Sequence, residues 1–262
     1  MIQIMQARAY AKINWALRVT GKRADGFHDI ETLFQTISLH DTLTFRPSDR
    51  LTLTCDDPTI STDETNLVLR AVRAAGVGDV AIELRKRIPA GGGLGGGSSD
   101  AAATLQAFGA GHAALSLGSD VPFFLTGGTA YATGRGEIIT PLPPVAGIPL
   151  LLLIPEERMS TATAYAMLRR FSPPLGIDRY RAMIADDLLA HTGELVNDFE
   201  EPIFDALPRL RHLKARLLEA GAAWAAMSGS GSTIVGAFRE AGERDAAITR
   251  FGDVRVEPAE TI

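Results

Sequence analysis

Residues 89–100 read PAGGGLGGGSSD, a run of glycines interrupted only by Leu94. Glycine lets a backbone adopt positive φ angles and approach a ligand closely, so that consecutive N–H groups can point at phosphate oxygens. A predicted strand at 80–84 precedes the run, and a helix-forming segment at 101–108 follows it. The start of that helix would add unpaired N–H groups and the positive end of its dipole. The run therefore predicts a phosphate cradle, with Ser98 and Ser99 offering hydroxyls to a phosphate or to Mg²⁺.

A linker and the better-known nucleotide-binding motifs account for the glycine run less well. A flexible linker rarely joins a strand directly to a helix that begins with a capping Ser. A Rossmann fingerprint requires a βαβ unit, whereas the N-terminal segments predict a β-meander. A Walker A loop needs Gly-Lys-Ser/Thr, and no Lys follows these glycines. The His-Arg-Asp and Asp-Phe-Gly motifs of protein kinases are absent from the sequence, so the cradle points to a different nucleotide fold.

The N-terminal side of the run is rich in strand patterning. Apolar and polar residues alternate in the first segment, whose mainly polar face carries Lys12 and Asn14. Ser61 and Glu64 have the spacing of a capping box before a predicted helix at 67–75. The segments predicted as strands of a β-meander are 8–20, 27–39, 42–45 and 51–54.

The C-terminal side alternates strands and helices. Four prolines between 141 and 149 mark the best internal boundary, which divides the chain into domains 1–147 and 148–262. The pattern as a whole predicts an α+β fold with two packed lobes. Strands are predicted at 150–154, 224–227 and 233–238, and helices at 208–220 and 240–251.

Composition excludes several functional classes. The chain has 262 residues, of which 46% are hydrophobic, and a net charge of −5. An acidic chain argues against nucleic acid as a partner, because binding through a wide surface needs a basic face. Cys55 is the only cysteine, so neither an internal disulfide nor a Cys-rich zinc site can form. We find no membrane-spanning segment and no signal peptide in the sequence, and we therefore expect a cytoplasmic protein without a membrane partner.

Three segments in the same order as in a known superfamily carry a resemblance. PAGGGLGGGSSDAA at 89–102 resembles the phosphate loop of the GHMP kinases, AKINWAL at 11–17 their first motif, and MSGSGSTIVGAF at 227–238 their third. The resemblance implies a two-lobed fold, with an N-terminal lobe like domain 2 of ribosomal protein S5 and a ferredoxin-like C-terminal lobe. It also implies ATP and Mg²⁺ as cofactors.

A narrower resemblance adds a substrate. The sequence from 11 to 43, LGSDVPFFLTGGTAYATGRGE at 117–137 and NDFE at 197–200 are similar to the 4-diphosphocytidyl-2-C-methyl-D-erythritol kinases. Members of that family phosphorylate the 2-hydroxyl of the cytidine-diphosphate-linked methylerythritol in non-mevalonate isoprenoid biosynthesis. The resemblance therefore implies a small-molecule substrate for a chain that is a monomer or a weak homodimer.

The same resemblance implies roles for individual residues. Asp120 is the expected catalytic base, and Lys12 pairs with it and with the reacting hydroxyl, which would keep the carboxylate ionised. Asn14 would bind the methylerythritol end, since it projects to the same face as Lys12. The metal ligands are not identified. The ATP-binding residues implied by the match are Pro89, Ala90, Gly91, Gly92, Gly93, Leu94, Gly95, Gly96, Gly97, Ser98 and Ser99.

Aromatic residues are expected at the cytidine end. Phe27 and His28 stand where the family has Tyr-His, so that stacking on cytosine is retained and the phenol hydroxyl is lost. Tyr165 would form a second aromatic wall. The small residues at 228–232 would let that loop approach the phosphate loop. Two alternatives stay open at this point: another GHMP kinase, such as a homoserine or mevalonate kinase, and a catalytically inactive binding protein on the same scaffold.

Overall fold

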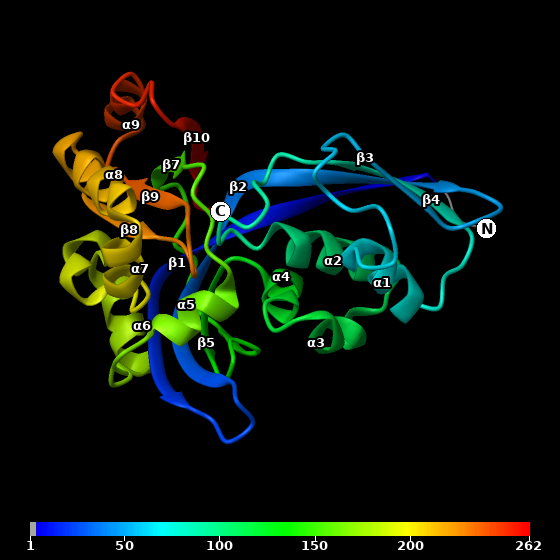
Figure 1. The fold of residues 1–262 in the computed structure, drawn as a ribbon, viewed down its shortest axis with the longest axis horizontal. Coiled ribbons are helices and arrows are strands. Elements are labelled where there is room, and N and C mark those ends of the chain that lie inside the picture. The colour runs from blue at the N-terminus through cyan, green and yellow to red at the C-terminus, as the bar shows by residue number, and fades with distance from the viewer. Residues whose placement is uncertain (1–3) are drawn as a thin grey trace. The chain divides into compact units, whose positions relative to one another are not determined.

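The computed structural model describes residues 4–262 and contains both helices and strands (Figure 1). It divides into two compact units. The first comprises residues up to 11, 39–90 and 95–127, and the second comprises 12–38, 91–94 and 128–262. The α+β prediction is confirmed. The predicted domain boundary between residues 147 and 148 is a different division of the chain and stays a prediction.

Two long strands, β1 (Met5–Lys22) and β2 (His28–Pro47), contribute residues to both units. The predicted break between strands at 27–39 and 42–45 is wrong, since β2 runs through both. A polar residue, Asp41, lies at this point of the strand. Asp41 is fully buried, and its carboxylate accepts backbone N–H groups of the segment after β4, so the strand continues without an unsatisfied charge.

In the first unit, β4 (Val80–Arg85) lies antiparallel to β2 and parallel to β3 (Thr52–Cys55). The predicted meander is therefore wrong, because β3 has β4 and not β2 as its neighbour. The reason is the connection: helix α1 (Leu67–Ala74) joins β3 to β4, and a helical crossover returns the chain in the same direction. A tight turn, which a meander needs, would have reversed it.

Helix α1 begins at a different cap from the one predicted. Asn66 is the N-cap, and its side chain accepts the N–H of Val68 at 2.8 Å. Ser61 accepts the N–H of Asp63 instead, so the predicted Ser61–Glu64 capping box is wrong. The remaining helices of the unit are α2 (Gly96–Ala107), α3 (Ala114–Leu117) and α4 (Val121–Thr126), with a 3₁₀ turn at Gly111–Ala113.

Helices α1 and α2 pack on the strands of the first unit (Figure 1). The amphipathic pattern of α1 places its apolar side chains on one side, whereas α2 is buried on most sides and contributes Ala103 to this core. The buried residues of this core include Leu43, Phe45, Val68, Leu69, Val72, Val80, Ile82, Leu84 and Ala103.

The second unit contains a four-stranded antiparallel sheet in the order β10-β7-β9-β8. The three predicted strands are confirmed as β7 (Pro149–Ile154), β8 (Trp224–Met227) and β9 (Ile234–Ala237). β10 is Arg255–Glu260. In the same unit, β5 (Thr129–Thr133) lies antiparallel to β2 and to β6 (Ile138–Pro141).

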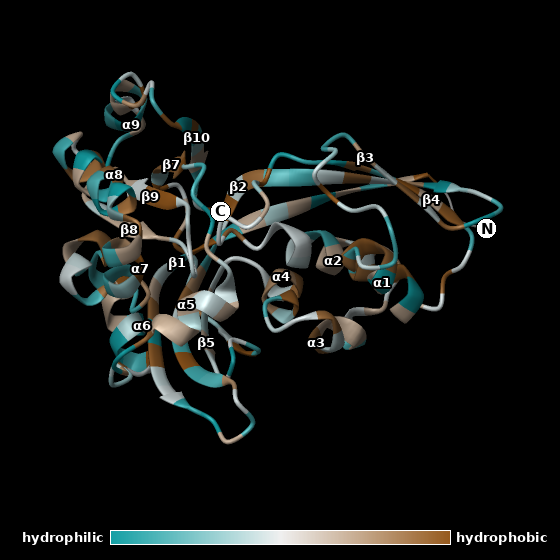
Figure 2. Cartoon of the chain, viewed as in Figure 1, coloured by the Kyte–Doolittle hydropathy of each residue, from teal (hydrophilic) through white to brown (hydrophobic). Residues whose placement is uncertain are grey.

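Helix α8 (Pro208–Glu219) covers this sheet and matches the predicted helix. It buries Leu210, Leu213 and Leu217, while β7 is buried along its whole length and hydrophobic from Leu150 to Ile154 (Figure 2). The other helices are α5 (Thr161–Met167), α6 (Ile177–Asp186), α7 (Glu200–Ala206) and α9 (Ala241–Ile248), with 3₁₀ turns at Leu188–Ala190 and Thr192–Glu194. None of the helices formed by residues 4–262 has the length and apolar character needed to cross a bilayer.

Candidate active site

The glycine run adopts an alternating backbone conformation. Gly91, Gly93 and Gly95 have φ angles of +67°, +77° and +73°, whereas the residues between them do not have positive φ. Alternation of this kind turns successive N–H groups toward one side and forms an anion-binding concavity. The backbone geometry is therefore that of a phosphate-binding loop.

In the second unit, the first half of this loop packs against residues 228–232. The Ser228 hydroxyl donates to the Gly93 carbonyl at 2.9 Å, and the N–H of Thr233 donates to the Gly92 carbonyl at 3.3 Å. A Cβ at position 93 would lie 2.0 Å from the Ser228 carbonyl oxygen, so only glycine fits. The prediction that small residues let these two loops approach one another is confirmed.

In the first unit, the glycine run continues into α2. The helix begins at Gly96 after Gly95 as N-cap, and no side chain caps it, so the predicted Ser cap is wrong. A glycine in the left-handed conformation already turns the chain into the helix at this point. Ser99 is buried, and its hydroxyl donates to the Tyr10 carbonyl at 2.6 Å. Ser98, in the first turn, is half-buried.

A buried ion triad, which sequence reasoning missed, lies beside the start of α2 in the first unit. The Lys86 ammonium donates to Asp100 at 2.8 Å and to Asp41. Asp41 also accepts the backbone N–H groups of Arg87 at 2.5 Å and Ile88 at 2.8 Å, two residues that precede the glycine run. Asp41 lies 45 residues from Lys86, and no local spacing connects the two.

The triad has two carboxyl groups and one ammonium, and this imbalance affects the pKa of Asp100. Burial raises the pKa of Asp100 to about 7, more than the Lys86 ammonium lowers it, and the Asp41 carboxylate adds to the rise. The second carboxyl oxygen of Asp100 is buried and has no hydrogen-bond partner within residues 4–262. Ionised Asp100 is therefore an unfavourable state of the fold.

Lys12 and Asn14 lie on β1 in the second unit and are both buried, at 3% and 2% exposure. The Lys12 ammonium donates to the Asn14 side-chain oxygen at 2.7 Å and lies 5.3 Å from the centre of the Phe34 ring. The backbone N–H of Lys12 donates to the Leu94 carbonyl at 3.0 Å. The structure thus brings Lys12, Asn14 and the first half of the glycine loop together. Lys12 is therefore not a solvated lysine on the outside of a strand.

Asp120 lies in the first unit as the N-cap residue of α4. Its side chain is half-buried and makes no capping hydrogen bond, although an aspartate at this position commonly does. Helix capping therefore does not account for this residue. Its pairing with Lys12 stays a prediction.

The aromatic residues of the predicted cytidine end lie in the second unit but do not share one partner. The His28 ring stacks on Tyr165, with centroids 4.7 Å apart and 19° between the planes. Phe171, which sequence reasoning missed, lies 6.0 Å from His28 and is 47% exposed. Phe27 is 52% exposed, and the Arg135 guanidinium lies 4.6 Å from the centre of its ring. Burial, with a smaller effect of Lys22, lowers the pKa of His28 and favours its neutral form.

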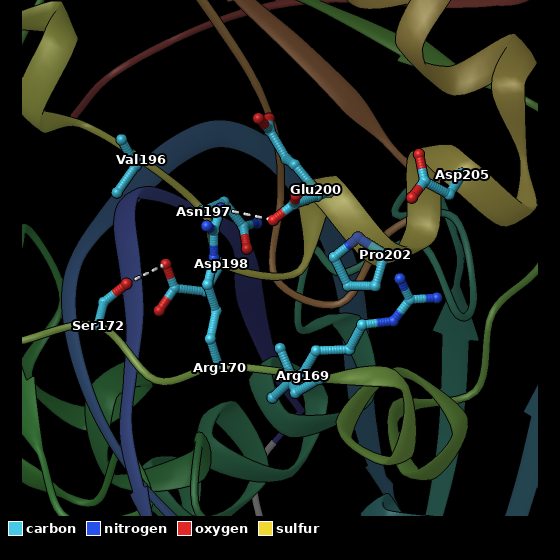
Figure 3. Close-up of a pocket in the computed structure, with 11 residues that line it drawn as sticks. Arg169, Arg170, Ser172, Val196, Asn197, Asp198, Glu200, Pro202 and Asp205 are labelled. Atoms are coloured by element: carbon cyan, nitrogen blue, oxygen red, sulfur yellow. Dashed lines mark hydrogen bonds and ion pairs between the residues drawn. The ribbon is translucent and has the colours of Figure 1, made fainter.

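Figure 3 shows a pocket of the second unit around the NDFE segment. The half-buried carboxylates of Asp198 and Glu200, which line it, already have protein partners. Asp198 accepts the Ser172 hydroxyl at 2.7 Å and the Val19 N–H at 2.7 Å, and Glu200 accepts the Met227 N–H at 2.8 Å. These carboxylates therefore stabilise the walls of the pocket by hydrogen bonds within the protein. Its lining consists of Leu168, Arg169, Arg170, Ser172, Val196, Asn197, Asp198, Glu200, Glu201, Pro202 and Asp205.

Comparison with known proteins places this arrangement in a family. Residues 66–128 match the GHMP kinase N-terminal domain, and residues 182–254 match the GHMP kinase C-terminal domain. The 4-diphosphocytidyl-2-C-methyl-D-erythritol kinase of Chlorobium luteolum is 43% identical over 94% of this chain and 93% of that protein. The kinase of the same name from Solibacter usitatus is 44% identical over 94% of this chain and 85% of that protein.

Solved structures agree. A crystal structure of 4-(cytidine 5'-diphospho)-2C-methyl-D-erythritol kinase, 36% identical, superposes with a TM-score of 0.84 over 98% of this chain and 99% of that one. A homoserine kinase from Cytophaga hutchinsonii, 20% identical with a TM-score of 0.63 over 100% of this chain and 96% of that one, shares the fold alone. The chain belongs to the 4-diphosphocytidyl-2-C-methyl-D-erythritol kinase family of the GHMP kinases.

Proposed function

We propose that this chain transfers the γ-phosphoryl group of ATP to the 2-hydroxyl of 4-diphosphocytidyl-2-C-methyl-D-erythritol, a step of non-mevalonate isoprenoid biosynthesis. The family membership carries the assignment of substrate and reaction. The observation in the structure that supports it most directly is the burial of Lys12 beside the glycine loop, because a buried ammonium next to a phosphate cradle suits phosphoryl transfer.

The phosphates of ATP bind the loop from Gly91 to Ser99. GHMP kinases use ATP as the phosphoryl donor, generally with a divalent metal. Mg²⁺ usually binds one or two protein ligands together with the phosphates of the nucleotide, so it does not need a cage of carboxylates. The loop fits this mode, because it carries the hydroxyl-bearing side chain of Ser98 in the first turn of α2, while the hydroxyl of Ser99 is engaged by Tyr10. Mg²⁺ held there would neutralise charge on the phosphates.

Asp120 and Lys12 carry the chemistry on the acceptor. Asp120 accepts the proton of the 2-hydroxyl as the oxygen attacks the γ-phosphorus. The Lys12 ammonium stabilises negative charge on the transferring group. Asn14 orients the ammonium through its side-chain oxygen.

The cytidine end binds among the aromatic residues of the second unit. His28 and Tyr165 form a stacked pair of partly exposed rings, which suits a flat base, and Phe171 extends it. Phe27 adds a ring face already approached by Arg135, whose positive charge suits the diphosphate of the acceptor.

An ADP-release assay tests the proposal. ATP, Mg²⁺ and the cytidine-diphosphate acceptor are expected to give acceptor-dependent ADP with the unmodified chain and almost none with Lys12→Ala. Mevalonate and homoserine serve as competing acceptors. Turnover of either, without turnover of the cytidine substrate, would show a different GHMP kinase. Absence of ADP with every acceptor would support an inactive binding protein.

A further inference from the structure

The NDFE segment at 197–200 is the one motif of the sequence that the proposed chemistry leaves without a task. Asn197 is 5% exposed. Its side-chain amide donates both of its hydrogens, to the Met227 carbonyl at 2.7 Å and to the Gly229 carbonyl at 2.8 Å. Its oxygen accepts the Phe199 N–H at 3.0 Å. Both amide hydrogens therefore fix the loop that follows β8.

That loop is in turn bonded to the lysine's partner. The Gly229 N–H donates to the Asn14 side-chain oxygen at 3.0 Å, the same atom that accepts the Lys12 ammonium at 2.7 Å. A Cβ at Gly229 would lie 3.3 Å from the Lys12 nitrogen, so the loop backbone passes directly beside the ammonium. One oxygen thus joins the loop to the lysine.

The orientation of the Asn14 amide is determined by its other end. Its nitrogen donates to the Thr32 hydroxyl at 2.8 Å, and that hydroxyl donates onward to the Ala16 carbonyl at 2.6 Å. If the amide were rotated by 180°, its NH₂ group would face the Lys12 ammonium and the Gly229 N–H, which are also donors. Its oxygen is therefore held toward Lys12 and Gly229.

We infer that Asn197 is a positioning residue for Lys12, acting through Gly229 and Asn14. The inference rests on the proposed function for the catalytic role of Lys12. The chain of hydrogen bonds from Asn197 through Gly229 and Asn14 to Lys12, here called the relay, is observed in the structure. It joins separate segments of the second unit by bonds of 2.7, 2.8 and 3.0 Å that are buried from end to end. A displacement of the loop would move the acceptor of the ammonium, and small displacements of reacting groups reduce turnover strongly.

Asn197→Asp tests the relay with the least change of shape. The substitution replaces the two donated hydrogens by a second oxygen that faces two carbonyl oxygens, so the loop must move away. We expect kcat to fall between about 10- and 100-fold, as for a misplaced catalytic group.

The chain offers a matched control in Gln35, which is fully buried in the same unit. Its amide nitrogen also donates to two backbone carbonyls, those of Thr36 at 2.9 Å and Ile262 at 3.0 Å. Gln35→Glu therefore imposes the same electrostatic repulsion away from the relay. Both variants are expected to melt at lower temperature, but only Asn197→Asp is expected to lose turnover. An equal loss of kcat in the two variants, or none in Asn197→Asp, overturns the inference.

A second readout does not depend on turnover. The chain has only four lysines, Lys12, Lys22, Lys86 and Lys214, so that each ammonium or its isotope-labelled methylated form can be resolved by NMR and assigned by Lys→Arg substitution. The Lys12 signal is expected to shift in Asn197→Asp and to stay in place in Gln35→Glu.

The two readouts separate the two proposals. If the unmodified chain produces no ADP with the cytidine acceptor while the Lys12 signal still responds to Asn197 alone, the proposed function fails and the relay stands. If the signal does not respond, the relay fails whatever the activity. Asn197→Ser, which is neutral and smaller, replaces Asn197→Asp should the latter not fold, with the same expected shift and the same overturning result.

Discussion

The carbonyl oxygen of Ser228 occupies the space that a side chain at position 93 would need. A Cβ at Gly93 would lie 2.0 Å from that oxygen. The φ angle of Gly93, +77°, is also strained for any other residue. Gly91 has a similar φ of +67°, but a Cβ there would meet only the Arg158 side chain, at 3.9 Å. The two glycines therefore need the same left-handed backbone, but a side chain would have room at position 91 and none at position 93.

Gly93→Ala is expected to be far more damaging than Gly91→Ala. Both substitutions cost about 1–2 kcal/mol for a left-handed backbone. Gly93→Ala adds about 1–3 kcal/mol for overlap with the Ser228 loop, and it displaces the phosphate loop. Urea unfolding and kcat measured on both variants check this order. Equal destabilisation by the two substitutions would contradict the close approach of the loops.

Tyr165→Leu is expected to weaken binding of the acceptor selectively. The stacked His28–Tyr165 pair offers its surface to the base, and stacking of a base on an aromatic side chain is worth about 1–3 kcal/mol. KM for the cytidine acceptor should rise between about 5- and 150-fold, with KM for ATP nearly unchanged. Tyr165→Phe keeps the ring and serves as the control. A rise in KM for ATP of the same size would contradict the assignment.

The stacked pair is also expected to be sensitive to acid. Because burial lowers the pKa of His28, the fold favours the neutral imidazole. The corresponding stability is present above the ordinary pKa of 6.5 and is lost as pH falls from there through the lowered pKa. The melting temperature of the unmodified chain should therefore fall relative to that of His28→Phe as the pH is lowered from about 7.5 to about 5.5. A difference in melting temperature that is constant with pH would contradict the lowered pKa of His28.

Local patterns predicted most of the elements but not how they pair. The strand at 224–227 and the helix at 208–220 follow from periodicity, and both are present within a residue of the expected bounds. The order β3-β4-β2 could not be predicted in this way, because pairing depends on where a crossover helix returns the chain. Asn66 shows the same limit at short range, since several polar residues near a helix start compete to cap it.

Site residues in a recognisable motif were predicted, and those supplied by distant segments were not. Lys12 and Asn14 could be named from the motif, but their burial could not, because it depends on residues distant in the sequence, such as Leu94 and Gly229. The triad of Asp41, Lys86 and Asp100 has no sequence signature, since each charge has the local pattern of an exposed polar residue. Only the folded chain reveals that these three residues contact one another.

Asp100→Asn is expected to change how stability depends on pH. With its pKa raised to about 7, Asp100 holds a proton in the fold that the unfolded chain releases near the ordinary value of 3.8. Its contribution to stability is therefore complete below the ordinary value and is lost as pH rises toward 7. The amide introduced by Asp100→Asn cannot ionise and leaves Lys86 with Asp41 as its one charged partner in the triad. Relative to the unmodified chain, the variant should therefore gain unfolding free energy between about pH 5 and about pH 8. Urea titrations at several pH values measure this difference, and a change of the opposite sign would contradict the raised pKa.

Asp120→Asn is expected to abolish most turnover while leaving the nucleotide site intact. The substitution keeps the shape of the side chain but removes the base, and a positioned general base contributes about 10²–10⁴-fold to rate. The carboxylate does not cap α4. The Kd for ATP should change less than about twofold. Asp187→Asn is the matched control, because Asp187 is also an N-cap aspartate but does bond its helix, to the Leu189 N–H at 3.0 Å. It should lose stability and keep its turnover. If Asp120→Asn retained more than about half of the normal kcat, proton transfer would have to be assigned to another group.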